Sequence, residues 1–115
     1  MLLGQQFVVD LYDCNPDIIS HVDGVRSALL KAAELSGAHI VDNVFHQFSP
    51  YGVSGVVVIA ESHLAIHTWP EHSYCAVDYF TCSKDIDWQR AFESLKEDFE
   101  SSSYDVKEIK REIHN

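Results

Sequence analysis

Basic residues are scarce in this chain. Its 115 residues include eight Lys and Arg against eighteen Asp and Glu, and the formal net charge is −10 at pH 7. Phosphates are neutralised by clustered Lys and Arg, so this composition argues against a nucleic-acid partner. An acidic protein is compatible with a cationic small molecule, although net charge affects the encounter more than it identifies the ligand.

The sequence also lacks long apolar runs and a secretion signal. No run approaches the roughly 20 apolar residues that span a bilayer. Residues 1–6 contain neither the basic region nor the apolar region of a signal peptide. We therefore expect a soluble cytoplasmic protein that has no membrane partner.

Cysteine, proline and glycine are few. Cys14, Cys75 and Cys82 form no Cys-x-x-Cys pair, and their odd number leaves one thiol outside any disulfide, which indicates buried thiols or a reactive one. With three Pro, five Gly and an apolar content of 46%, the chain is not expected to be disordered. Residues 1–115 fit a single domain that could gain stability by pairing with a second copy.

The spacing of apolar residues predicts the secondary structure. A spacing of three and four predicts one helix over residues 22–35, ended by Gly37, and another over residues 88–99, capped by Asp87. Asn15 and Pro16 suit the start of a single helical turn. Strands are predicted at residues 7–12, 38–48, 53–60, 64–69, 74–82 and 104–113, the last charged enough to be an edge.

The resulting order, β-α-β-β-β-β-α-β, indicates an α+β two-layer sandwich, in which two helices cover one face of an antiparallel sheet. The other face then needs a cover. We expect a second subunit there, because Val57 and Ile59 would otherwise contribute to an exposed apolar patch. The chain is therefore predicted to form a homodimer or a higher homo-oligomer.

The central stretch, residues 53–72, holds most of the reactive side chains. A metal site is one interpretation of its polar residues, but a spacing of four on a strand places His63 and His67 only on the same face. The third ligand would have to be His72 or Glu71, and we expect no metal.

Other residues of this stretch permit two further interpretations. Ser62 beside His63 suggests a hydrolytic Ser-His pair, but no Gly-x-Ser-x-Gly elbow surrounds Ser62. Taken singly, Ser62 is typical of a turn, His67 of a strand, and Cys82 of a small buried apolar residue.

Taken together, these residues resemble a known family, the prokaryotic S-adenosylmethionine decarboxylases, which are small pyruvoyl-dependent enzymes of polyamine synthesis. Coarser agreement extends over nearly the whole chain. The resemblance rests on four motifs: Phe45-His46-x-Phe48, Pro50-Tyr51-Gly52-Val53-Ser54-Gly55-Val56-Val57-Val58, Glu61-Ser62-His63-Leu64-x-Ile66-His67-Thr68-Trp69-Pro70-Glu71, and Ala76-Val77-Asp78 through Phe80-Thr81-Cys82.

The resemblance implies that the proenzyme cuts itself between Glu61 and Ser62, giving a β chain of residues 1–61 and an α chain of residues 62–115. Ser62 Oγ would attack the preceding carbonyl carbon and convert the amide to an ester. Removal of the Ser62 Cα proton would expel the Glu61 carboxylate and leave a dehydroalanine that tautomerises and hydrolyses to the pyruvoyl cofactor. His67 is the candidate base, and Ser54 would assist processing.

The family pattern also implies roles in the decarboxylation of S-adenosylmethionine, whose product donates aminopropyl groups for spermidine synthesis. The pyruvoyl ketone would form a Schiff base with the substrate amine and withdraw the electrons left when carbon dioxide departs. Cys82 corresponds to the proton donor at the substrate α-carbon. In this family the substrate pocket lies between protomers. Five residues correspond to substrate contacts: Phe48, His67, Glu71, Trp69 and Leu3.

The sequence departs from the family pattern at Gly4-Gln5-Gln6, where a basic residue and a histidine usually follow the glycine, and at Ser73 and Cys75. These changes leave open a second substrate class, arginine or ornithine, which relatives of this fold decarboxylate with the same chemistry. A third hypothesis is an unprocessed regulatory paralogue. Its signature would be a lost serine, histidine or cysteine, yet Ser62, His67 and Cys82 are all present.

Overall fold

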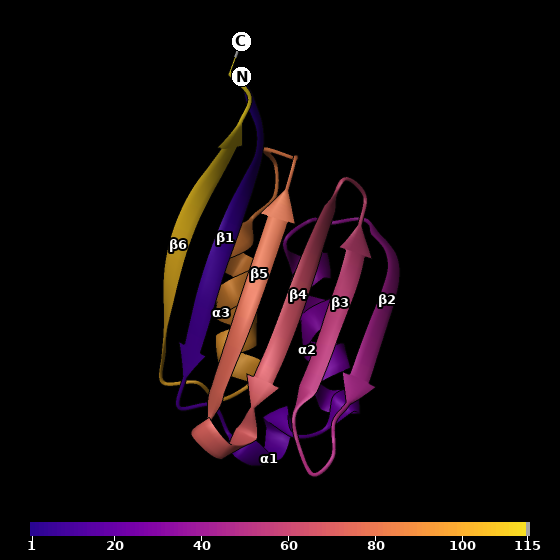
Figure 1. The fold of residues 1–115 in the computed structure, drawn as a ribbon, viewed down its shortest axis with the longest axis vertical. Coiled ribbons are helices and arrows are strands. Elements are labelled where there is room, and N and C mark those ends of the chain that lie inside the picture. Colours follow the sequence, from indigo (N-terminus) through magenta and orange to yellow (C-terminus); the bar gives the residue numbers. More distant parts are fainter. Residues whose placement is uncertain (115) are drawn as a thin grey trace.

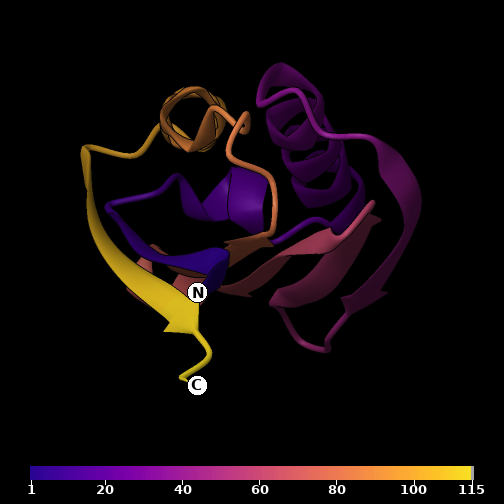
Figure 2. The same cartoon turned by 90° about the horizontal axis from the view of Figure 1, so that it is seen from above.

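A computed structural model describes residues 1–114, so residue 115 of the predicted domain lies outside the described residues. Helices cover one face of a six-stranded antiparallel sheet (Figures 1 and 2). The predicted two-layer α+β sandwich is confirmed. Its elements are β1 (Leu2–Tyr12), α1 (Pro16–Ile19), α2 (Val22–Leu35), β2 (Ile40–Gln47), β3 (Val53–Ile59), β4 (Ser62–Trp69), the 3-10 turn η1 (Pro70–His72), β5 (Tyr74–Thr81), α3 (Trp88–Asp98) and β6 (Ser103–Glu112).

The strands lie in the order β2-β3-β4-β5-β1-β6. The N-terminal strand β1 is inserted between β5 and β6 and pairs with both (Figure 1). It begins at Leu2, earlier than predicted, because Leu2 to Gln6 pair with the end of β6. The prediction that β6 forms an edge is confirmed, and β2 forms the other edge.

The helix boundaries follow local capping signals. Asn15 Oδ1 accepts the Asp17 N–H at 2.9 Å, and Asp87 Oδ1 accepts the Arg90 N–H at 3.1 Å, as expected for N-caps. The sequence gives no such signal for α2. There, Gln47 Oε1 at the end of β2 accepts the Val22 N–H at 2.8 Å, a cap that lies 25 positions further along the chain.

The core lies between the helices and the sheet. Val57 and Ile59 point into it, with exposed fractions of 0% and 3%, so the expectation that they lie on the face without helices is wrong. Their neighbours Val56 and Val58 are exposed instead, at 40% and 43%. Because β3 is apolar at both parities, its sequence cannot tell which face the helices cover. We call the helix-free face of the sheet the open face (Figure 2).

The hairpin between β3 and β4 is tighter than predicted. Ser62 already pairs with Ile59, so Ala60 and Glu61 alone form the turn. Glu61 has φ +61°, a left-handed conformation that costs a non-glycine residue about 1 kcal/mol or more. Within residues 1–114, no helix is long and apolar enough to cross a membrane.

Candidate active site

The predicted site residues lie at the two opposite ends of β4. Ser62 opens the strand and His67 follows five positions later, which corresponds to about 16 Å of extended chain. Because this offset is odd, the two side chains also lie on opposite faces of the sheet. The structure therefore does not bring Ser62 and His67 together within one chain. We call the two regions the Ser62 end and the His67 end, at the top and the bottom of β4 in Figure 1.

At the Ser62 end, a strained turn precedes a serine whose hydroxyl is held. Ser62 pairs with Thr81 of β5, and Ser62 Oγ donates a hydrogen bond to Thr81 Oγ1 at 3.2 Å. Ser62 itself is half-buried, whereas Glu61 is exposed. A left-handed residue followed by a fixed hydroxyl places backbone strain next to a potential nucleophile.

Cys82 and Leu3 also belong to the Ser62 end. Both line one small hollow that Thr81 borders. Cys82 is exposed, whereas Cys14 and Cys75 are buried, so the interpretation of Cys82 as a small buried residue is wrong. The structure thus gathers Leu3, Ser62 and Cys82 around Thr81.

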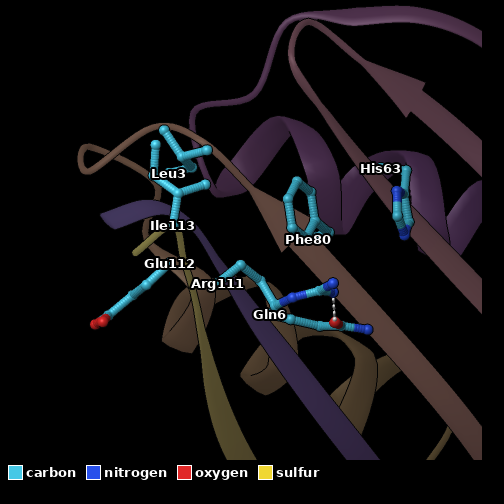
Figure 3. Close-up of a pocket in the computed structure, with 7 residues that line it drawn as sticks. All are labelled: Leu3, Gln6, His63, Phe80, Arg111, Glu112 and Ile113. Atoms are coloured by element: carbon cyan, nitrogen blue, oxygen red, sulfur yellow. Dashed lines mark hydrogen bonds between the residues drawn. The ribbon is translucent and has the colours of Figure 1, made fainter. Parts of the chain in front are cut away.

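A cleft of about 510 Å³ opens beside this region (Figure 3). The His63 ring stacks on the Phe80 ring, with centroids 5.7 Å apart, and Arg111 donates to Gln6 Oε1 at 3.1 Å. Apart from Leu3, none of these residues was predicted to belong to the site, because they come from strands far apart in the chain. The cleft is lined by Leu3, Gln6, His63, Phe80, Arg111, Glu112 and Ile113.

At the His67 end, the five remaining predicted residues line a single pocket of about 220 Å³: Phe48, Ser54, His67, Trp69 and Glu71. Ser54 and His67 are cross-strand partners, and Ser54 Oγ lies 2.7 Å from His67 Nδ1. When Nδ1 carries the proton, it donates to Ser54 and leaves Nε2 free to accept another proton. The structure therefore brings these five residues together in one pocket, whereas Leu3 lies at the Ser62 end.

Buried hydrogen bonds fix the backbone beneath this pocket. Thr68 is buried, and its hydroxyl donates to Ile19 O at 2.8 Å and accepts the Val53 N–H at 2.9 Å. Gln47 Nε2 donates to Gly52 O at 3.1 Å, which closes the loop that carries Phe48. Side chains on the pocket floor therefore sit on a rigid support.

Aromatic rings surround the His67 end. Trp69 stacks on Tyr74, with centroids 5.4 Å apart, and His46 contacts Phe48 edge-on at 4.5 Å. Trp69 is 39% exposed, so it lines the pocket and does not pack in the core. Burial, together with a hydrogen bond to Asp10, raises the pKa of Tyr74 above its ordinary value, so this ring stays neutral beside the pocket.

The geometry also bears on the metal site and on the hydrolytic Ser-His pair considered above. His63 and His67 share a face but lie about 13 Å apart along the strand, and no group of three potential ligands in residues 1–114 could hold a metal ion. The only side-chain hydrogen-bond partner found for Ser62 in this part of the chain is Thr81, a hydroxyl and not a base.

The chain matches one family model and many relatives over nearly its whole length. The family model described as S-adenosylmethionine decarboxylase matches residues 5–112. A protein of Acidithiobacillus ferrooxidans named S-adenosylmethionine decarboxylase proenzyme is 51% identical over 109 residues, which cover 95% of this chain and 82% of that protein. A protein of the same name from Thermosipho melanesiensis is 49% identical over 106 residues, 92% of this chain and 82% of the relative.

Solved structures of adenosylmethionine decarboxylases share the fold of this chain. The crystal structure of the adenosylmethionine decarboxylase from Aquifex aeolicus superposes with a TM-score of 0.89 and 32% identity, covering 99% of this chain and 94% of that one. A Trypanosoma brucei structure, titled AdoMetDC-delta26 monomer, has a TM-score of 0.63 over 89% of this chain and 44% of its own, but at 14% identity it supports the fold alone. With a family model over residues 5–112 and relatives that share about half of its residues, the chain belongs to the S-adenosylmethionine decarboxylase family and is, as its sequence predicts, a decarboxylase.

Proposed function

We propose that this chain is a proenzyme that cuts itself between Glu61 and Ser62 and then decarboxylates S-adenosylmethionine. The observation that carries the proposal is the turn at the Ser62 end, where a left-handed Glu61 precedes a serine whose hydroxyl is held by Thr81. Relatives at about half identity bear the name proenzyme, which supports a processing step in this chain as well.

The residues of the turn suit an acyl shift. Ser62 Oγ bonds to the Glu61 carbonyl carbon, the amide C–N bond breaks, and the serine nitrogen takes up the proton, which gives an ester. Relief of the strain at Glu61 would favour this step. Removal of the Ser62 Cα proton by a base then expels the Glu61 carboxylate, separates residues 1–61 from residues 62–115 and leaves a dehydroalanine at position 62. The dehydroalanine tautomerises to an imine, which takes up water and releases ammonia to give the pyruvoyl group.

A second copy of the chain is the proposed source of that base. His67 and Ser62 of one chain lie at opposite ends of β4. A two-fold axis parallel to the open faces and perpendicular to the strands would place the Ser62 end of one chain opposite the His67 end of its partner. The same arrangement would cover the exposed apolar side chains Val44, Val56 and Val58 of the open face.

The residues around position 62 fit a pyruvoyl group made from Ser62. Position 62 would become the N-terminus of β4, next to the cleft lined by His63 and close to the exposed thiol of Cys82. When present, the group withdraws the electrons that the departing carbon dioxide leaves behind. Cys82 would return a proton to the substrate α-carbon, which requires a protonated thiol.

The His67 end has the chemistry to hold an adenosyl group and a sulfonium. Phe48 and His67 offer planar faces for a purine ring, and Glu71 offers a carboxylate for ribose hydroxyls. A cationic sulfonium near the faces of Phe48 and Trp69 would gain about 0.5–2 kcal/mol. Leu3 would contact the substrate from the Ser62 end. The product would be an aminopropyl donor for spermidine synthesis, which we expect to take place in the cytoplasm.

Intact-mass analysis and carbon dioxide release test the proposal together. We expect purified protein to appear as two polypeptides, and we expect carbon dioxide to be released from S-adenosylmethionine but not from arginine or ornithine. Ser62→Ala is the matched control and should remain one uncut chain. A wild-type chain that stays uncut would favour a non-catalytic paralogue, and release from arginine or ornithine alone would assign the second substrate class.

A further inference from the structure

Thr81 is a buried residue at the end of β5 whose hydroxyl holds Ser62, but the reaction steps described so far assign it no role. It is 2% exposed and pairs with Ser62 on one side and with Gln5 on the other. A hydroxyl buried this deeply requires hydrogen-bond partners. Thr81 Oγ1 accepts the Ser83 N–H at 3.0 Å, lies 3.4 Å from Ser83 O, and accepts the Ser62 hydroxyl at 3.2 Å.

These contacts fix the direction of the Ser62–Thr81 hydrogen bond. A hydroxyl has one proton and two acceptor positions. The Ser83 N–H occupies one acceptor position of Thr81, and Ser83 O receives its proton. Because the Thr81 proton is directed at Ser83 O, Thr81 can only accept in its contact with Ser62. Ser62 Oγ–H is therefore the donor and points at Thr81 Oγ1. Thr81 is itself stiff, because its branched Cβ restricts rotation about χ1.

We propose that Thr81 is a positioning residue for self-cleavage, whose hydroxyl holds Ser62 in the rotamer from which Oγ attacks the Glu61 carbonyl carbon. The inference rests on the proposed self-cleavage and names a residue for its first step. That step is an isomerisation: the Oγ–C bond forms, the C–N bond breaks, and the proton of Oγ ends on the nitrogen of Ser62. No group from outside the chain is consumed.

The first step can be isolated with His67→Ala. This chain lacks the base of the second step, so it should stop at the ester, which hydroxylamine cleaves at Glu61. Synthesis in a cell-free translation system gives a defined starting time. The yield of hydroxylamine-released fragment of residues 1–61 over time then measures the acyl shift without any enzyme activity.

Variants of Thr81 in this background test the role of its hydroxyl. We expect Thr81→Val to form the ester about tenfold more slowly, which corresponds to about 1.4 kcal/mol of barrier. Thr81→Ser should restore the rate, because it keeps the hydroxyl. Thr81→Cys, assayed with reductant, differs from Thr81→Ser by one atom and should be slow, because a thiol is a weak acceptor.

A matched control separates this role from a merely structural one. Ser83→Ala removes the contact from Asp85 N to Ser83 Oγ but leaves the Thr81 hydroxyl and its partners in place. It should form the ester at the rate of the parent chain. Thermal melting of each variant reports the folded fraction, so that rates are compared for folded protein only.

Two results would overturn the inference. One is a Thr81→Val chain that forms the ester as fast as its parent, and the other is an equal rate for Thr81→Cys and Thr81→Ser. The same series in the otherwise wild-type chain, read as the cut fraction, does not depend on trapping the ester. If the wild-type chain itself is never cut, the proposed function fails instead, and the two failures are thus distinguishable.

Discussion

Three cysteines of this chain have very different surroundings. Cys82 is exposed at the Ser62 end, whereas Cys14 and Cys75 are buried. A hydrogen bond to Cys14 and burial together raise the pKa of the Cys75 thiol well above its ordinary value, so Cys75 stays protonated and inert. Of the three thiols, only that of Cys82 is exposed, in the small hollow that Thr81 borders.

A substitution at Cys82 tests its role in proton transfer. We expect Cys82→Ala to be cut like the wild type but to release carbon dioxide at least about 100-fold more slowly, the usual scale for a lost general acid. Cys75→Ala is the matched control and should keep both activities. Intact mass reports the cut and carbon dioxide release reports turnover. Full activity of Cys82→Ala would remove Cys82 as the proton donor.

Single site residues were predictable from the sequence to very different degrees. Ser54 and His67 both belong to the family motifs. In the structure they are cross-strand partners, with Ser54 Oγ 2.7 Å from His67 Nδ1. Thr81 lies within the last of the four motifs, yet its contact with Ser62 depends on the register of β4 with β5. Register and strand order are set by long-range pairing, which local sequence does not reveal. For the same reason, the sequence does not predict that His63, Phe80 and Arg111 line one cleft.

At the scale of elements, periodicity predicted both long helices and all six strands. It could not assign the two faces of β3, where both parities are apolar, and so Val57 and Ile59 were placed on the wrong side. Composition predicted the hairpin turn but not its tightness. Ser62 and His63 look like turn residues by their polarity, yet they pair with β5 as the first two residues of β4.

Two glycines should respond to alanine substitution with opposite signs. A Cβ at Gly55 would lie 2.1 Å from Phe45 Cδ2, so Gly55→Ala must displace a ring that packs against the core and should destabilise the fold by about 1–3 kcal/mol. A Cβ at Gly24 in α2 meets only Ile18 O at 3.6 Å, and Gly24→Ala should stabilise the fold by up to about 1 kcal/mol.

Urea denaturation of the two variants in a Ser62→Ala background, which avoids mixtures of cut and uncut chains, measures both effects. A Gly55→Ala chain as stable as its parent would mean that the Phe45 ring can move aside without cost.

The contact between β6 and α3 should make stability depend on alkaline pH. Tyr104 Oη donates to Glu93 Oε1 at 2.6 Å. Burial, together with this hydrogen bond, raises the pKa of Tyr104 to about 12 from an ordinary 10.0. A raised folded-state pKa contributes stability that is complete below pH 10 and is lost as the pH rises towards about 12.

Tyr104→Phe should therefore be less stable than the wild type below about pH 10, by about 1 kcal/mol for the lost hydrogen bond. The difference should shrink between about pH 10 and pH 12, because only the wild type loses this titrating contact. Urea midpoints of both proteins across this range provide the measurement. Other tyrosines titrate in both proteins, so the difference isolates Tyr104. Parallel curves would contradict the prediction.

At the scale of the whole molecule, the separation of Ser62 from His67 predicts complementation between chains. Neither Ser62→Ala nor His67→Ala should complete the cut alone. In a heterodimer, the Ser62→Ala chain still carries His67, which it can present to the intact Ser62 of its partner. We therefore expect the His67→Ala chain to be cut when the two variants are produced together.

Different affinity tags on the two variants allow the heterodimer to be purified, and intact mass then shows which chain is cut. Two wild-type chains with the same tags serve as the control. An uncut His67→Ala chain in a purified heterodimer, beside a fully cut control, would place the base in the same chain as the serine or in another residue.

The position of β1 has a consequence for the molecule after the proposed cut. Residues 1–61 would keep β1, β2 and β3, and residues 62–115 would keep β4, β5 and β6. Three of the five strand pairings, β3 with β4 and β1 with both β5 and β6, would then join different polypeptides. Unfolding the mature protein would release two fragments that must find each other again, and its recovery would depend on their concentration. Before the cut, the chain would fold in an intramolecular reaction. After the cut, the same interleaved sheet would form again only by association of two polypeptides.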